Sequence, residues 1–292
     1  MKLRRLLGES IACVQSLRWS KPHHLAVLAL FKNEAHVLGE WVQHYASEGA
    51  TTIHLVNNNS SDDYLTALQP FLESGLVVLH HDSRLHAQRQ IYNEHLQRLR
   101  PLCQWLLVCD LDEFIYARGT DRRCVDVLRS LPTWVSSVQI PWKMFGSSGL
   151  REQPRAGVRA GFRHRADADD QAQPHPCMPA SSRIPGKTIA RSSRIRMLDA
   201  HSASLLWGRR ILPDGSPALK GSFQPINEAL LQRSRLHLNH YAIQSEQLFR
   251  QVKMSRGDVN NADYAAIRDM DYFRRYDRNE RLDEELAHRC SS

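Results

Sequence analysis

The sequence has no long apolar run and no paired cysteines. None of its apolar stretches approaches the ~18 to 20 uninterrupted residues of a transmembrane helix, and neither a long apolar segment nor a cleavage site follows the basic N-terminus. The six cysteines form no C-x-x-C pair and no zinc spacing. We therefore expect neither a membrane-spanning protein nor a disulfide scaffold, and a reducing cytoplasm fits the cysteine usage best.

Positive charge is in excess, but it is scattered along the chain. The formal net charge is +8 over 292 residues, which favours an anionic partner such as nucleic acid, a membrane surface or a phosphorylated substrate. Because the sequence has no nucleic-acid-binding motif, we expect no nucleic acid. The basic residues 1–8 suit either a solvated helix or a short amphipathic helix lying peripherally on a membrane.

Short apolar runs alternate with helical periodicity along the first half of the chain. Strands are expected at residues 25–30, 51–56, 76–79 and 105–109, with helices at about 37–49, 63–72 and 85–99. Further strands are expected at 135–140 and 235–241, and further helices at about 125–131 and 245–256. This order predicts an α/β fold with a doubly wound, mostly parallel central sheet flanked by helices.

The strand at 105–109 ends in two carboxylates, Asp110 and Asp112, with Glu113 behind them. Acids at the end of a buried strand are costly unless a positive group sits there, and Mg²⁺ or Mn²⁺ bridging to phosphates is one answer. A plain turn or helix cap is the alternative. Right-handed crossovers would bring the loops after the first two strands to the same edge. Those loops contain Lys32, Asn33, Glu34, Asn57 and Asp62.

Several segments in a fixed order resemble the nucleotide-diphosphate-sugar glycosyltransferases of the GT-A fold, in particular the family 2-like and family 92 group. The matching segments are Phe31 to Glu34, Glu40-Trp41, His44-Tyr45, Asn57 to Asp62, Trp105 with Asp110 to Phe114, Phe145 to Gly149, Lys187, Asn239 to Tyr241, and Ser245, Phe249, Lys253, Arg256 and Gly257. Each is weak alone, and it is their order that is specific.

The resemblance implies a metal-dependent transferase that moves a sugar, with inversion, from a nucleotide-diphosphate-sugar, UDP-sugar first, to a glycan or lipid-linked acceptor in polysaccharide biosynthesis. Asp110, Asp112 and His240 would hold Mn²⁺ or Mg²⁺. The residues expected at the donor are Phe31, Lys32, Asn33, Glu34, Asn57, Asp62, Asp110, Lys187, Lys253 and Arg256. This chain has Asn57 where the family has Asp, and Ala160-Gly-Phe162 where an acid precedes the aromatic. The catalytic base is therefore unassigned, with Glu113 and Glu152 as candidates.

The expected organisation has three parts: a basic helix or extension at 1–24, a GT-A-like domain at 25–257 with an irregular loop or lid at about 151–193, and a peripheral helical tail at 258–292. Two other functions stay open. One is a Mg²⁺-dependent phosphatase with a nucleophilic aspartate, although its aspartate normally follows the first strand of the fold. The other is a non-catalytic protein that binds anions or polysaccharide.

Overall fold

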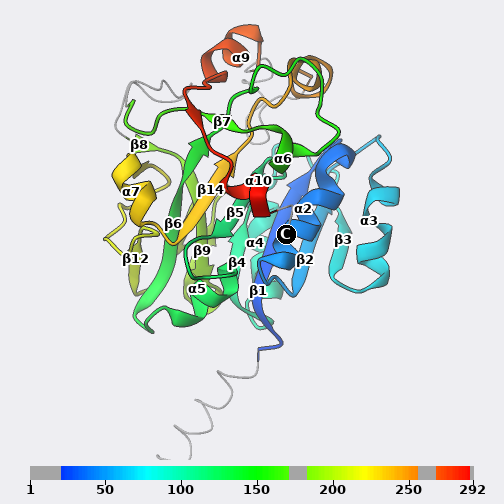
Figure 1. Ribbon diagram of the computed structural model, residues 1–292. Helices are drawn as coiled ribbons and strands as arrows, with labels where there is room; N and C mark the ends of the chain where they lie inside the picture. Colours follow the sequence, from blue (N-terminus) through cyan, green and yellow to red (C-terminus); the bar gives the residue numbers. More distant parts are fainter. Residues whose placement is uncertain (1–20, 171–182, 256–267, 290–292) are drawn as a thin grey trace, which may run out of the picture.

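A computed structural model describes residues 21–170, 183–255 and 268–289. Its centre is a nine-stranded sheet in the order β3-β2-β1-β4-β9-β6-β14-β5, with β12 beside β6 (Figure 1). These strands are β1 (His23–Phe31), β2 (Thr52–Asn57), β3 (Val77–His81), β4 (Cys103–Val108), β5 (Glu113–Ala117), β6 (Val135–Met144), β9 (Gly186–Arg191), β12 (Arg209–Ile211) and β14 (Leu236–His240). Short two-stranded pairs join β10 (Ile195–Leu198) to β11 (Ala203–Leu205), β8 (Arg183–Ile184) to β13 (Gln224–Pro225), and β7 (His164–Arg165) to β15 (Arg281–Leu282).

Helices cover both faces of this sheet. The helices of the described residues are α2 (Ala35–Ser47), α3 (Tyr64–Glu73), α4 (Gln88–Leu99), α5 (Cys124–Ser130), α6 (Val158–Gly161), α7 (Glu228–Arg233), α8 (Glu246–Leu248), α9 (Met270–Tyr276) and α10 (Glu285–Arg289), with a 3-10 turn η1 (Ser192–Arg194) and a π-helical turn η2 (Phe249–Lys253). In the described part of the chain, none of these helices is both long enough and apolar enough to cross a bilayer.

The sheet is mostly parallel. The pairs β1–β2, β1–β4, β2–β3, β6–β14 and β6–β12 are parallel, whereas β9 runs antiparallel to both β4 and β6, and β5 runs antiparallel to β14. The predicted α/β class is therefore confirmed, together with each strand and helix expected before residue 145. β5, which directly follows the Asp110–Glu113 turn, was not expected.

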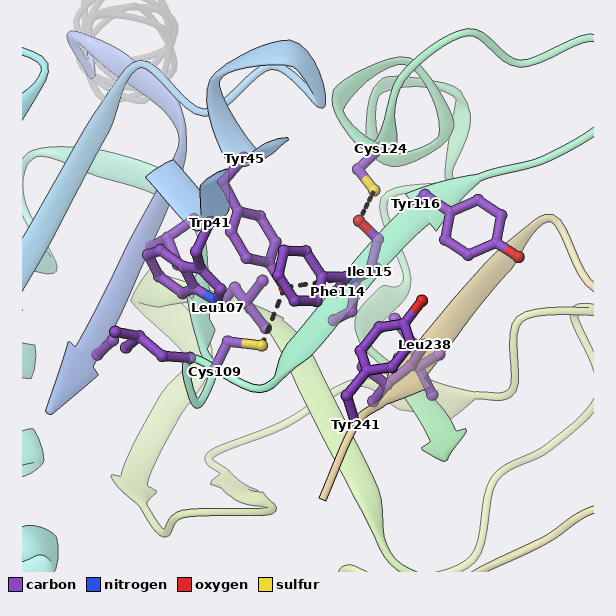
Figure 2. Packing of buried hydrophobic residues seen from close by; sticks show 14 of the residues in the cluster. Trp41, Tyr45, Leu107, Cys109, Phe114, Ile115, Tyr116, Cys124, Leu238 and Tyr241 are labelled. Carbon is purple, nitrogen blue, oxygen red and sulfur yellow. Dashed lines mark hydrogen bonds between the residues drawn. The ribbon is translucent and has the colours of Figure 1, made fainter. Parts of the chain in front are cut away.

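Alternate residues of the inner strands bury on opposite faces. In β1, Leu25, Val27 and Ala29 pack with the helices α2 and α3, while Ala26 and Leu28 pack with α4. A strand that is covered on both faces needs apolar residues at every position, which explains the continuous apolar runs in the sequence. Figure 2 shows the aromatic part of the first core, where α2 lies against β4 and β5.

The expected loop or lid at 151–193 is partly wrong. Residues 171–182 lie outside the described structure, but β9 is a central strand that closes the sheet between β4 and β6. The apolar pattern of this strand is interrupted by Lys187, Thr188 and Arg191, and for that reason the sequence did not predict it. A lysine in a central strand is tolerable only where carboxylates from elsewhere compensate its charge. Here they are those of Asp110 and Glu113, which lie between the end of β4 and the start of β5.

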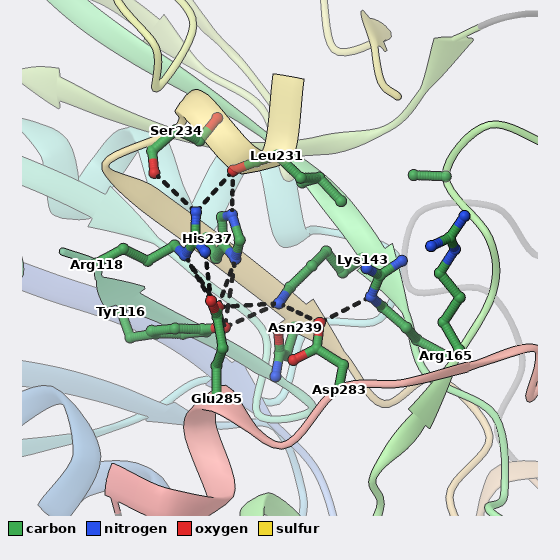
Figure 3. A network of polar contacts seen from close by, with 12 residues as sticks. Tyr116, Arg118, Lys143, Arg165, Leu231, Ser234, His237, Asn239, Asp283 and Glu285 are labelled. Carbon is green, nitrogen blue, oxygen red and sulfur yellow. Dashed lines mark hydrogen bonds and ion pairs between the residues drawn. The ribbon is translucent and has the colours of Figure 1, made fainter. Parts of the chain in front are cut away.

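The described part of the tail is not peripheral, as Figure 3 shows. Asp283, just before α10, accepts hydrogen bonds from Lys143 of β6 (2.8 Å) and Arg165 of β7 (2.7 Å). Glu285 accepts from the Tyr116 hydroxyl (2.9 Å) and pairs with Arg118. Residues 268–289 are thus joined to the rest of the domain by the buried ion pairs of Asp283 and the partly exposed pair of Arg118 and Glu285. The expected basic extension lies outside the described residues except for 21–24, of which 23–24 begin β1.

Candidate functional site

The turn between β4 and β5 contains Asp110, Asp112 and Glu113, and helix α2 holds its backbone in place. The Trp41 indole N–H donates to the carbonyls of Asp110 (2.9 Å) and Glu113 (3.2 Å). The Tyr45 hydroxyl donates to the Glu113 carbonyl (3.1 Å) and accepts from the backbone N–H of Ile115 (3.1 Å). Figure 2 shows both aromatic side chains reaching from α2 toward this turn. Two aromatic residues of the sequence motif thus have a structural task, which is to fix the acidic turn.

Asp110 and Glu113 share the buried ammonium group of Lys187. Lys187 Nζ lies 2.7 Å from Asp110 Oδ2 and 3.2 Å from Glu113 Oε2, and it also donates to the Ala200 carbonyl (2.8 Å). The side chain of Lys187 is 0% exposed, whereas that of Asp110 is 34% exposed. Lys187 therefore binds one oxygen of the Asp110 carboxylate from the protein interior, while the Asp110 side chain remains partly exposed to water.

Asp112 is held in a similar way from the other side. Its Oδ2 accepts from Lys253 Nζ (2.6 Å), and its Oδ1 lies 3.6 Å from His240 Nε2. Lys253 belongs to the π-helical turn η2, a rare conformation that is frequent at functional sites. His240 ends β14, and the next residue, Tyr241, donates its backbone N–H to the Asp112 carbonyl (2.8 Å).

The electrostatics of the turn keep Asp112 charged. Burial alone would raise the pKa of Asp112, but Lys253 and His240 hold it well below the usual value. Burial alone would lower the pKa of Lys187, and the charges of Asp110 and Glu113 raise it instead. Burial raises the pKa of Glu113, against the charge of Lys187. In this cluster three carboxyl groups, of Asp110, Asp112 and Glu113, thus face the two ammonium groups of Lys187 and Lys253.

The loops after β1 and β2 contact each other at the same edge. Asn33 Oδ1 accepts from the Ser61 N–H (2.7 Å), and Asp62 Oδ2 accepts from the Ala35 N–H at the start of α2 (2.7 Å). Asn57 Oδ1 accepts from the Ser60 N–H (2.9 Å). Strand register aligns Phe31 with Asn57. The structure thus brings these predicted donor residues together, and it gives Asp62 and Asn57 structural hydrogen bonds as well.

The remaining predicted residues are placed as follows. Lys32 is exposed, Phe31 and Glu34 are buried, and Phe31 packs edge-on against Tyr64. Glu152 is exposed. Glu113 is 0% exposed, and its oxygens accept from Trp142 Nε1 (2.7 Å) and the Asp110 N–H (2.9 Å). Glu113 therefore props the turn and does not face an acceptor. Arg256 lies outside the described residues.

Sequence reasoning missed Trp142. Its indole binds Glu113, and its ring lies 4.1 Å from the His240 ring, centroid to centroid, at an angle of 43°. The ring of His201 meets the Trp142 ring edge to face, with the two centroids 5.2 Å apart. Trp142 lies in β6, beyond the end of the strand expected from the sequence. A tryptophan directly after a strand-breaking proline was the only signal available.

Asp110, Asp112 and His240 suit a divalent cation by donor type, since two carboxylates and an imidazole are ligands that Mn²⁺ accepts. The 3.6 Å between Asp112 and His240 is a spacing that one ion can bridge. The carboxylate of Asp110 lies farther from this pair of ligand atoms. Among the described residues, no set of three His, Cys, Asp or Glu ligand atoms within 4.8 Å of one another includes it. The preformed part of such a site is thus the pair Asp112 and His240.

Comparison with known proteins gives a consistent family. A glycosyltransferase family 92 protein of Ricinus communis is 27% identical over 150 residues, which is 50% of this chain and 27% of that protein. A glycosyltransferase family 92 protein of Oryza sativa subsp. japonica is 27% identical over 154 residues, covering 52% of this chain and 26% of that protein. The chain matches only about a quarter of the length of these curated relatives.

Solved structures give a weaker likeness. S. aureus TarS is 11% identical with a TM-score of 0.35, covering 58% of this chain and 28% of TarS. Residues 1–349 of TarS in complex with UDP give 12% identity and a TM-score of 0.32 over 58% of this chain and 47% of that one. Scores this low carry no conclusion about the site. The family assignment depends on the match to the model of glycosyltransferase family 92, which spans residues 22–279, and this protein therefore belongs to that family.

Proposed function

We propose that this chain is a metal-dependent glycosyltransferase that transfers a sugar from a nucleotide-diphosphate-sugar, UDP-sugar first, to a saccharide or lipid-linked acceptor with inversion at the anomeric carbon. Family membership supports the reaction class. The observation that carries the proposal is the pair Asp110 and Asp112, which are partly exposed at the end of β4, with one oxygen of each held by a buried lysine.

The two lysines prepare the aspartates for this role. Each ammonium group fixes one carboxylate oxygen and reduces the repulsion between two acids one residue apart. The other oxygen, Oδ1, is left for a ligand: for Asp110 it has no hydrogen-bond partner in the described structure, and for Asp112 it faces His240. Because both ammonium groups are buried, Lys187 and Lys253 act through the aspartates rather than by touching the donor.

Asp110, Asp112 and His240 would hold the metal ion. When bound, Mn²⁺ or Mg²⁺ supplies positive charge against the leaving diphosphate. The Trp41 and Tyr45 contacts keep the turn rigid, so the carboxylates need little reorganisation to bind. Glu152 stays the exposed candidate for the base that deprotonates the acceptor hydroxyl.

A thermal-shift screen of nucleotide-sugars with and without Mn²⁺ tests the proposal. A UDP-sugar should raise Tm with Mn²⁺ present and much less without it, since a ligand that binds only the folded state stabilises it. Equal stabilisation with and without Mn²⁺ would favour a plain anion-binding protein. The anomeric configuration of the product, compared with the donor by NMR, tests inversion.

Two variants serve as a matched pair for this screen. Asp112→Asn should lose the Mn²⁺-dependent shift because it removes the charge beside His240. Asp283→Asn, in the buried tail cluster, should keep the shift at a lower starting Tm. A full Mn²⁺-dependent shift in Asp112→Asn would contradict the proposed ligand role.

A further inference from the structure

Three histidines converge on the α4 face of the sheet. In β2, Ile53 and Leu55 pack toward the core of α2 and α3 while Val56 packs with α4, so His54 belongs to the α4 face. In β3, Val77 and Leu79 pack toward α2 and α3, which places His80 on the α4 face too. His95 is on α4 itself. One ligand atom from each of the three lies within 4.8 Å of the other two.

The rings are already in contact. His54 Nδ1 and His80 Nε2 are 3.0 Å apart with the rings stacked, and the rings of His80 and His95 meet edge to face at 4.5 Å. His95 Nδ1 is buried and has no hydrogen-bond partner in the described structure. Zn–N bonds of ~2.0 Å in a tetrahedral site place neighbouring nitrogens about 3.3 Å apart. The three ligand atoms lie within 4.8 Å of one another, close to that spacing, and a bound ion would replace the hydrogen bond between the His54 and His80 nitrogens.

The chemistry of the cluster is that of a ligand set. Burial, followed by the neighbouring histidines, lowers the pKa of His54 to about 4, and burial with His80 and Arg98 nearby lowers that of His95 to about 4. Burial also lowers the pKa of His80. Neutral imidazoles are the form that binds metal. His54 and His80 are only half-buried, so an ion can reach the site from the edge strand β3.

We propose that His54, His80 and His95 form a second metal site, which takes a single divalent ion of the zinc class with water as a fourth ligand. Three imidazoles suit Zn²⁺, Co²⁺ or Ni²⁺, whereas Mg²⁺ and Mn²⁺ prefer the oxygen ligands at the Asp110 turn. The ion would join the outer strands β2 and β3 to α4. This site is separate from Asp110, Asp112 and His240, and it does not depend on the proposed transferase activity.

Titrating chelator-treated protein with Co²⁺ and Zn²⁺ tests the proposal directly. We expect one equivalent of Co²⁺ to give visible d–d bands of a low-coordinate nitrogen site, and Zn²⁺ to displace it and raise Tm by about 5 °C at 100-fold excess over Kd. The absence of both the bands and a stoichiometric Zn²⁺ isotherm in the wild type would overturn the proposal.

Variants assign the site. His80→Gln, at a half-buried edge position, and His95→Gln should each weaken Zn²⁺ binding by at least ~100-fold, as expected for a lost ligand. His86→Asn is the matched control, because His86 is exposed, lies outside the cluster and has a φ of 53° that asparagine tolerates. Asp112→Asn should leave the Co²⁺ spectrum intact. Unchanged affinity in both glutamine variants, or loss in Asp112→Asn alone, would place the ion elsewhere and overturn the assignment.

Discussion

Two lysine–carboxylate clusters in this molecule use the same chemistry with different access to water. The first, which we call the closed cluster, joins the tail to the sheet. In it Lys143 and Asp283 are 0% and 8% exposed, and Arg165 binds the same oxygen of Asp283. The second, which we call the open cluster, surrounds the turn between β4 and β5. In it Lys253 and Asp112 are 4% and 19% exposed, and the second oxygen of Asp112 faces His240. Both clusters lie at strands of one sheet.

This difference in exposure distinguishes a cluster that stabilises the fold from one that can bind a ligand. Charges that are matched inside the protein bind nothing further, and they join the tail to β6 because breaking one partner leaves a buried charge. Carboxylates that are paired with a buried lysine through one oxygen but are partly exposed keep their second oxygen for a ligand. Exposure of the acid, rather than the presence of a lysine, therefore distinguishes the two.

The largest expected effect is on turnover in the open cluster. Asp112→Asn should lower turnover of the donor found in the screen by about 10³-fold, because it removes charge from the diphosphate end of the site. Steady-state kinetics at saturating Mn²⁺ measures this. Activity within a few-fold of wild type would place Asp112 with the residues that stabilise the fold.

The closed cluster should respond in stability instead. Asp283→Asn should lower the free energy of unfolding by about 3 kcal/mol, because Lys143 and Arg165 lose the charge that compensates them. Urea unfolding measures the loss. Turnover of the remaining folded protein should stay within a few-fold. A variant as stable as wild type would mean that the tail is not held by this pair.

Acid should weaken the closed cluster in two stages. His237 of β14 belongs to this cluster, because its Nδ1 lies 3.1 Å from Glu285 Oε2. Burial, followed by Lys143, lowers the pKa of His237 to about 4. Between pH 6.5 and 4 the unfolded chain therefore takes up a proton that the folded chain does not, and the free energy of unfolding decreases as the pH falls. At pH 5 this amounts to about 2 kcal/mol. Against burial, Lys143 and Arg165 lower the pKa of Asp283, so its contribution, present above pH ~4, is lost as pH falls further. Unfolding of His237→Gln from pH 7 to 5 should show a flatter dependence; an unchanged slope would remove His237 from this account.

The smallest effect on turnover is expected for Glu113, which is buried like Asp283 but belongs to the open cluster. Glu113→Gln should lower turnover about 10-fold, as for residues that orient a ligand without touching substrate. Steady-state kinetics with Glu152→Gln alongside measures it. A loss as deep as that of Asp112→Asn would instead make Glu113 part of the reaction.

The sequence by itself determined the alternating strands and helices as far as β6, and it located Asp110 and Asp112 at a strand end. These features are local: apolar periodicity states which face of an element is covered, and a run of apolar residues states that both are. His240 beside Asp112 was reached through family resemblance, because no local pattern relates residues 112 and 240.

Only the tertiary structure decided where charges are compensated. The sequence predicted a loop at β9 because Lys187 interrupts its apolar pattern. It predicted a peripheral tail because nothing in the sequence distinguishes Asp283 and Glu285 from solvent-exposed acids. The three histidines on β2, β3 and α4 carry no motif in sequence either. A buried charge or imidazole becomes stable or useful through partners from distant segments, and the chain order does not encode which partners those are.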